Sequence, residues 1–295
     1  QHLGPEQRQE EMMLAEAIKT FESDKKAQGV GKIVQASYKL QLSRLKEFSD
    51  SRSCYTVRAA LTLSNMVAFR GTWTYGSSYS AMIAQTRLKH FIRFCFNAGW
   101  IDREFKLSPI KVEYPETQPL TDAEYDRLLN AAEGETRLII ELMRWSGLAV
   151  RDAATLAKDD LQYDKTKDIY KIVRKRAKTG SHVYVPIPKA LGEKLKRTGA
   201  RGGYFFWTPD TWTAESFATS TGAAISAAFD KAGIPNVAHM VSHRLRDTFA
   251  VDLLQKGVAL EHVSKLLGHE SVKTTERHYA KWSKGRQDRL DTLVT

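Results

Sequence analysis

The chain has 295 residues and a mass of 33.4 kDa, the size of about two domains. Hydrophobic residues make up 42%, enough for two cores, yet no unbroken apolar run is long enough to span a membrane. The net charge of +11 favours a polyanionic partner such as nucleic acid, and two cysteines, Cys54 and Cys95, exclude a disulfide framework and indicate a soluble intracellular protein.

Residues 1–108 are predicted to form a helical domain. Apolar residues recur every three or four positions, as in amphipathic helices, at Met12, Ala15, Ile18 and Phe21 and again at Tyr38, Leu42, Leu45 and Phe48. A third helix is predicted at 86–96. Between residues 31 and 100 there are ten basic side chains and two acidic ones, which predicts a surface that contacts DNA phosphates. The residues that we assign to this surface are Lys39, Arg44, Arg87, Lys89 and Arg93.

A linker is predicted at 109–119, because three prolines in this stretch restrict the backbone to extended geometry. The second domain, 120–295, then opens on a helix. Thr121 is its predicted N-cap, and Glu124 stands at the capping-box position.

The rest of the second domain combines helices with a small sheet. Two β-rich stretches, 169–173 and 182–187, flank a turn at 178–180 and predict a hairpin. Periodic apolar residues predict helices at 217–232, 242–256, 259–267 and 271–280. The predicted fold class is therefore mainly α with a small β-sheet, in two domains.

Two of these helices carry residues suited to phosphate chemistry. In helix 242–256, Leu245, Phe249 and Leu253 form the predicted buried stripe. His243 and Arg246 lie three residues apart on a common face, and their N–H groups together suit a phosphate. Taken alone, this pair fits an ordinary solvated helix surface better.

Farther on, Gly268 is suited to end a helix, which places His269 on a turn. Tyr279 follows ten residues later. A tyrosine with its ordinary pKa of about 10 is a poor nucleophile and needs cationic neighbours or a base to attack phosphorus. A single tyrosine of this kind more often belongs to the core than to a catalytic site.

In this order, His243-x-x-Arg246, Leu-Gly-His269 and Thr-Thr-x-x-x-Tyr279 resemble the C-terminal signature of the tyrosine recombinases, the phage integrase family. Residues 146–156 resemble the first catalytic box of that family, and Lys178 matches its β-hairpin lysine.

One position departs from the family pattern. The family usually has an arginine directly after Gly-Leu, where this chain has Ala149. We favour Arg151 for the role of that arginine. The alternatives are Arg144 and the absence of any such residue. Asp152 stands where the family commonly has an acid.

The resemblance implies a two-domain architecture and a reaction. A SAM-like helical core-binding domain and an α+β catalytic domain would form a C-shaped clamp on duplex DNA, with a tail from about residue 280. Tyr279 would attack the DNA and form a 3′-phosphotyrosine. Arg151 and Arg246 would hold the phosphate, and Lys178 would protonate the leaving 5′-oxygen.

The remaining site residues also receive roles from the resemblance. His243 would move the proton of the nucleophile, His269 would donate to the phosphate, and Asp152 would orient the first arginine. Three basic residues would lie along the DNA backbone near the cut: Arg174, Lys175 and Arg176. No cofactor and no metal is implied.

The implied partners are double-stranded DNA with a specific recombination site and further copies of the chain, as a dimer on one site and a tetramer in the synapse. The expected location is the prokaryotic cytoplasm, at the nucleoid. Two other functions stay open. One is a catalytically impaired or non-catalytic sequence-specific DNA-binding protein, which Ala149 would explain, and the other is a type IB topoisomerase-like enzyme, which uses the same tyrosine chemistry.

Overall fold

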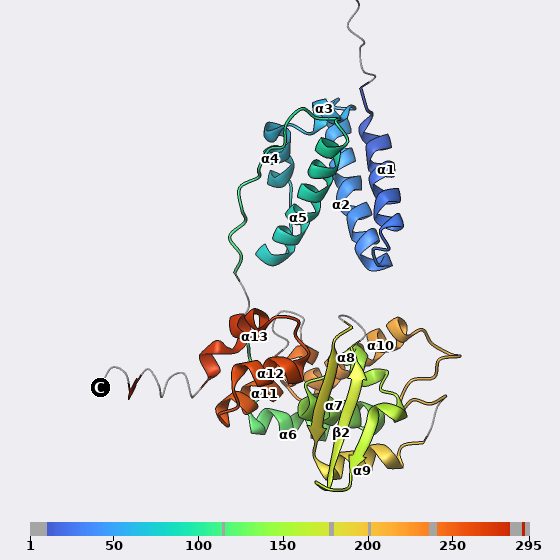
Figure 1. Ribbon diagram of the computed structural model, residues 1–295, viewed down its shortest axis with the longest axis vertical. Coiled ribbons are helices and arrows are strands. Elements are labelled where there is room, and N and C mark those ends of the chain that lie inside the picture. Colours follow the sequence, from blue (N-terminus) through green and yellow to red (C-terminus); the bar gives the residue numbers. More distant parts are fainter. Residues whose placement is uncertain are drawn as a thin grey trace, which may run out of the picture. The chain divides into compact units, whose positions relative to one another are not determined.

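The computed structural model describes residues 11–113, 116–176, 180–199, 202–235, 241–283 and 291–292. They belong to two compact units, Gln1–Tyr114 and Pro115–Thr295 (Figure 1). Helices predominate in both units and a small sheet lies in the second, which confirms the predicted fold class. No helix in the described part of the chain is long and apolar enough to cross a membrane.

The first unit is a group of helices around an aromatic core. Phe21 is fully buried, and its ring lies edge-on to Tyr38 and Phe91, with centroids 5.3 and 5.4 Å away. The predicted helix 86–96 is the second half of a longer helix. The helices are α1 (Leu14–Ala27), α2 (Lys32–Ser51), α3 (Val57–Ala60), α4 (Leu63–Gly71) and α5 (Ser78–Asn97).

The second unit packs helices against the sheet. They include the four helices predicted between 217 and 280, each shifted by a few residues at most. The helices are α6 (Asp122–Ala131), α7 (Gly134–Ser146), α8 (Val150–Ala154), α9 (Lys189–Arg197), α10 (Ala214–Lys231), α11 (Val241–Gln255), α12 (Leu260–Leu267) and α13 (Val272–Tyr279), with 3-10 turns at Lys158–Asp160 and Ala280–Trp282.

The sheet has three antiparallel strands in the order β1 (Leu161–Asp164), β2 (Ile169–Lys175) and β3 (His182–Ile187). β2 and β3 form the predicted hairpin, while β1 was not predicted. Because side chains alternate along a strand, one face of β2 points to the core: Tyr170 and Ile172 are buried, whereas Lys175 is exposed.

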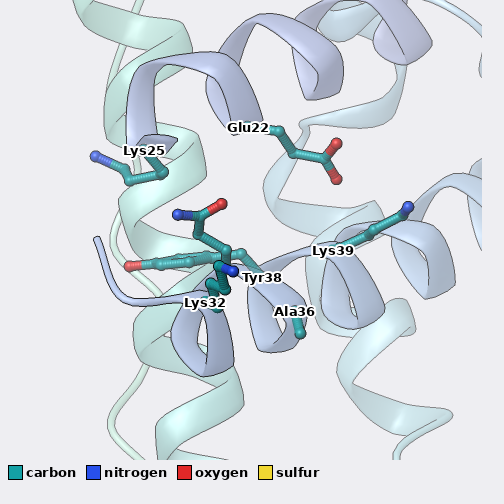
Figure 2. Close-up of a pocket in the computed structure, with 7 residues that line it drawn as sticks. Glu22, Lys25, Lys32, Ala36, Tyr38 and Lys39 are labelled. Atoms are coloured by element: carbon teal, nitrogen blue, oxygen red, sulfur yellow. The ribbon is translucent and has the colours of Figure 1, made fainter. Parts of the chain in front are cut away.

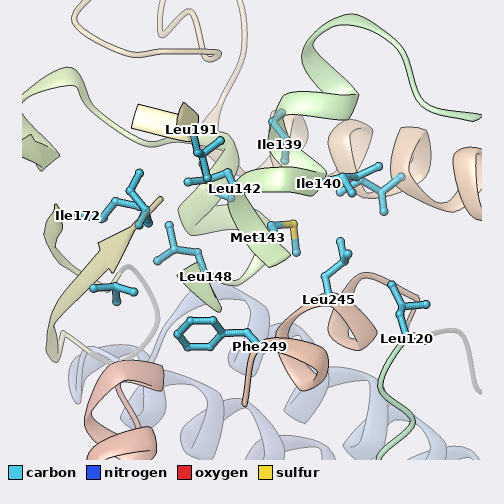
Figure 3. Packing of buried hydrophobic residues seen from close by; sticks show 14 of the residues in the cluster. Leu120, Ile139, Ile140, Leu142, Met143, Leu148, Ile172, Leu191, Leu245 and Phe249 are labelled. Carbon is cyan, nitrogen blue, oxygen red and sulfur yellow. The ribbon is translucent and has the colours of Figure 1, made fainter. Parts of the chain in front are cut away.

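The core of the second unit lies between α7, α11 and the sheet (Figure 3). Leu142 and Met143 of α7 belong to one buried cluster with Leu245 and Phe249 of α11 and with Ile172 of β2. Burial of each such side chain stabilises the fold by about 1.5–3 kcal/mol. This packing fixes the C-terminal end of α7 beside α11, where the candidate site lies.

The predicted start of α6 is confirmed and is also tied to α11. Thr121 and Glu124 form a capping box, with the Glu124 N–H donating to the Thr121 hydroxyl at 3.2 Å. Arg244 of α11 donates to the Glu124 carboxylate at 3.2 Å. The Leu120 N–H donates to the Thr248 hydroxyl at 2.8 Å, so the chain enters the second unit along α11.

Candidate active site

Arg246 lies at the centre of the candidate site, on α11, and is only 6% exposed. Its Nη1 donates to the carbonyl of Gly147, and its Nη2 donates to the carbonyl of Leu267 at 2.7 Å. Gly147 ends α7 and Leu267 ends α12. The last carbonyls of a helix have no partner within it and carry partial negative charge, so two helix C-termini orient this guanidinium.

His269 is held directly against Arg246. Gly268 adopts a left-handed conformation (φ +64°) that ends α12 as predicted and turns His269 inward. The His269 Nε2 lies 3.0 Å from Arg246 Nη2, and Nδ1 lies 2.7 Å from the Thr275 hydroxyl. Burial lowers the pKa of His269 to about 3, and the charges of Arg246 and Arg176 act in the same direction. The ring is therefore neutral at pH 7, with Nε2 as acceptor because an arginine can only donate.

Tyr279, the predicted nucleophile, is the last residue of α13 and is 4% exposed. Its hydroxyl donates to Asp247 Oδ1 at 2.6 Å. Burial raises the pKa of the Tyr279 hydroxyl, and the negative charge of Asp247 raises it further, while Arg246 lowers it. The tyrosine is thus protonated and paired with a carboxylate that was not predicted from the sequence.

Asp247 links the predicted residues of α11 to Tyr279. It directly follows Arg246 and lies one helical turn after His243, and this spacing is the signal that could have identified it. Burial raises the pKa of Asp247, whereas the hydrogen bond from Tyr279 and the charge of His243 lower it. His243 itself is exposed whereas Arg246 is buried, so the two side chains do not present one open surface.

The structure does not bring Arg151 to this group. Ala149, at the position where the family has its first arginine, is the N-cap of α8 and carries no charge. Arg151 lies on α8 with its side chain 41% exposed and pairs with Glu215 of α10 at 3.1 Å. Arg144 does not reach the site either, because its buried guanidinium pairs with Asp252.

Asp152 has the buried position expected of an orienting acid, and Arg176 pairs with it. The carboxylate is 3% exposed, and its Oδ2 lies 3.3 Å from Nη1 of Arg176. Arg176 follows β2 directly and is itself 6% exposed. The expectation that Arg176 contacts the DNA backbone near the cut therefore concerns a guanidinium that is enclosed beside Asp152, not one exposed on the hairpin surface.

The other basic residues of the hairpin differ from one another. Arg174 donates through Nη1 to the carbonyls of Asp152 and Thr155, the latter at 3.2 Å, so it supports the end of α8. Lys175 is exposed at the end of β2. Lys178, the predicted general acid, lies outside the described residues.

In the helical unit, the basic residues assigned to DNA lie on α2 and α5. Lys39 lines a hollow formed by α1 and α2 together with Lys25, Lys32 and one acid, Glu22 (Figure 2). Three ammonium groups around one carboxylate give this hollow a positive charge. Arg87 is half-buried, and the exposed residues are Lys39, Arg44, Lys89 and Arg93.

The segment that enters the second unit also contacts the helix of the nucleophile. The Thr117 hydroxyl donates to the carbonyl of His278 at 2.8 Å, directly before Tyr279. Lys281 pairs with Glu116 at 3.2 Å. Residues on both sides of Tyr279 are therefore attached to the first residues of the second unit.

Within the ranges that the structure describes, no group of three or more His, Cys, Asp or Glu side chains is placed to hold a metal ion. Cys54 and Cys95 are both free thiols. The polar groups that meet in the second unit are thus a tyrosine, two carboxylates, a neutral imidazole and two buried guanidinium groups.

Residues 118–286 match the phage integrase family, and the chain belongs to this family. It is a tyrosine recombinase, an enzyme that cuts and rejoins DNA. Tyrosine recombinase XerA of Pyrococcus furiosus is 26% identical over 277 residues, which cover 90% of each chain. A lambda integrase dimer bound to a COC′ core site shares the fold with a TM-score of 0.72, at 17% identity over 94% of this chain and 78% of that one. A lambda integrase tetramer bound to a Holliday junction has a TM-score of 0.70, at 18% identity over 91% of this chain and 77% of that one.

Proposed function

We propose that this recombinase acts on duplex DNA at a specific site and that Tyr279 is its nucleophile. The observation that carries the proposal is the convergence of Tyr279, Arg246 and His269 on one buried position, with Asp247 bound to the tyrosine hydroxyl. These residues come from α11, α13 and the turn after α12. The packing of these helices alone does not require such polar side chains to meet. A non-catalytic regulator gives no reason for this arrangement.

In the proposed reaction, Tyr279 Oη forms a bond to the scissile phosphorus while the bond from phosphorus to the 5′-oxygen breaks. The tyrosine proton passes to Asp247, which already accepts its hydrogen bond, and His243 one turn away completes the proton path. Lys178 gives a proton to the leaving 5′-oxygen. The 5′-hydroxyl of a second strand then attacks the phosphotyrosine and reverses these steps, so no external energy source is needed.

Arg246 supplies electrostatic stabilisation in this scheme. Two helix C-termini hold its guanidinium before DNA arrives, so little reorganisation is required when negative charge develops on the phosphate oxygens. His269 would contribute once it takes up a proton. A phosphate anion next to the imidazole favours this protonation, because it offsets the arginine charges that lower the pKa of His269.

Covalent trapping tests the proposal. Binding selection from a duplex library with a randomised core supplies a site, and a nicked duplex of that site is then incubated with the protein in EDTA. We expect a covalent protein–DNA band on a denaturing gel that is absent for Tyr279→Phe, while both proteins shift the same duplex on a native gel. Binding without a covalent band would instead establish the non-catalytic function.

The same site distinguishes a recombinase from a topoisomerase. A recombinase joins strands between two duplexes that carry the selected site. A type IB topoisomerase relaxes supercoiled plasmid without that site and without exchange. Relaxation of a plasmid lacking the site, together with no exchange, would assign the chain to the second class.

We further propose that the helical unit is the core-binding domain and that the second unit is catalytic. Lys39, Arg44 and Lys175 are among the exposed basic residues that would contact the DNA backbone. Assembly as a dimer on one site and a tetramer in the synapse follows the assemblies in which lambda integrase is found. The enzyme would act at the nucleoid in the prokaryotic cytoplasm. Sedimentation of the chain on one duplex, and on a four-way junction, tests the stoichiometry.

A further inference from the structure

A charged residue is absent where the first arginine of the site is expected, yet its acidic companion is present. Ala149 has only a methyl group, whereas Asp152 remains and is 3% exposed. A carboxylate buried to this extent needs a cationic or hydrogen-bonding partner. The structure provides Arg176, at 3.3 Å from the Asp152 Oδ2.

Arg176 reaches the same point as Arg246. Its Nη2 lies 3.5 Å from the carbonyl of Gly147, the oxygen that also accepts from Nη1 of Arg246. Both arginines are 6% exposed. Two guanidinium groups that share one acceptor repel each other, so a structure without an anion to bind gains little from placing them there.

The side chain of Arg176 also runs along the turn that carries His269. A Cβ atom added to Gly268 would lie 2.5 Å from Arg176 Nε and 2.8 Å from its Cδ, so only glycine leaves room for this path. The buried Nε has no acceptor among the described residues. Burial lowers the pKa of Arg176 to about 10, with Arg246 adding to the effect, and the group still stays charged at neutral pH.

We propose that Arg176 supplies the second guanidinium of the phosphate site, in place of the arginine that is absent at position 149, and that Asp152 orients it. The proposal rests on the recombinase function above. One arginine then arrives from α11 and the other from the end of β2, and each neutralises a non-bridging oxygen of the scissile phosphate. Arg176 lies two residues before Lys178, so the same hairpin carries both the clamp and the proposed general acid.

The charge on the phosphate provides the test. Arg176→Ala should slow covalent trapping of the nicked duplex by about 10³-fold, as expected for loss of a charged group that stabilises the transition state. Arg137→Ala is the matched control, because Arg137 is also an ion-paired arginine of the second unit, on α7 beside Glu141. It should trap DNA at the wild-type rate.

A methylphosphonate at the scissile position removes the charge that Arg176 is proposed to neutralise. On this duplex the wild type and Arg176→Ala should react at rates within about tenfold of each other. A merely structural arginine would leave Arg176→Ala as slow on the methylphosphonate as on the phosphate, and that outcome would overturn the proposal. The two methylphosphonate diastereomers also tell which oxygen each arginine serves.

Two further variants keep the test decisive if Arg176→Ala folds poorly. Arg176→Ala combined with Asp152→Ala removes both charges of this buried pair. This double variant should likewise react with the methylphosphonate duplex at nearly the wild-type rate. Arg176→Ala combined with Ala149→Arg returns an arginine to the family position and should recover phosphate cleavage.

Several results count against the proposal. Wild-type trapping by Arg176→Ala, or a 10³-fold loss in Arg151→Ala instead, overturns the role of Arg176 and leaves the recombinase function intact. Failure of the wild type to form a Tyr279-dependent covalent complex overturns the proposed nucleophile, and this is a separate result.

Discussion

Gly147 connects the stability of the second unit to its active site, so substituting it should affect both. Its backbone is left-handed (φ +63°), and an added Cβ would lie 2.4 Å from Cδ1 of the buried Phe249 ring. The left-handed conformation costs a non-glycine residue about 1–2 kcal/mol. Overpacking a core site costs about 1–3 kcal/mol more. For Gly147→Ala we therefore expect the free energy of unfolding to fall by about 3 kcal/mol.

Gly233, directly after the C-cap of α10, is the matched control. It has nearly the same backbone conformation (φ +64°), and an added Cβ would have no atom of the described residues within 4 Å. Gly233→Ala should therefore show only the conformational cost of about 1–2 kcal/mol. The difference between the two variants isolates the overlap with Phe249.

Differential scanning calorimetry of the full chain measures both variants. A domain of this size loses about 2–4 °C in Tm per kcal/mol, so the transition of the second unit should fall by about 6–12 °C for Gly147→Ala. For Gly233→Ala we expect the same transition to fall by roughly 2–8 °C. Equal shifts in the two variants would refute the reasoning, because they would mean that the Phe249 ring moves aside without cost.

Three further predictions concern individual side chains. Asp247→Asn preserves an acceptor for the Tyr279 hydroxyl but cannot take its proton, so trapping should slow by about 10²-fold or more with DNA binding intact; an unchanged rate would show that the proton goes elsewhere. His269 has a pKa of about 3 when folded and 6.5 as its ordinary value, so the folded state binds fewer protons between these values. Stability should therefore fall as the pH drops below about 6.5 toward 3, and a Tm–pH series should fall less steeply for His269→Gln. Asp252→Ala leaves the charge of buried Arg144 without its partner and should lower stability by about 3 kcal/mol in urea unfolding, whereas a loss below about 1 kcal/mol would show that the pair is solvated.

Local patterns predicted the helices of the site well. The apolar stripe of α11 places Leu245 and Phe249 in the core, while the predicted Leu253 is partly buried against that core and Leu254 is buried as well. The capping box of α6 and the glycine that ends α12 were also predicted, because each depends on residues at most four positions apart. β1 was missed because it is only four residues long and pairs with β2 through contacts that no local pattern encodes.

The partners of the arginines could not be predicted in this way. Arg246 meets a carbonyl 99 residues away, and Arg176 meets a carboxylate 24 residues away, with β1 and β2 between them in the sequence. One signal was available for Arg176. Arg176 lies an even number of residues after Tyr170 and Ile172. Because side chains alternate between the two faces of a strand, this spacing directs Arg176 to the same inner face of the sheet. Its basic neighbours instead favoured a position along the DNA backbone.

The contacts of Thr117 and Glu116 give the interdomain segment a second property besides connecting two units. A hydrogen bond and an ion pair anchor it to His278 and Lys281, which flank the nucleophile. A displacement of Glu116 or Thr117 therefore acts directly on residues within one or two positions of Tyr279. The first residues of the second unit can thus set the position of the tyrosine through these two contacts.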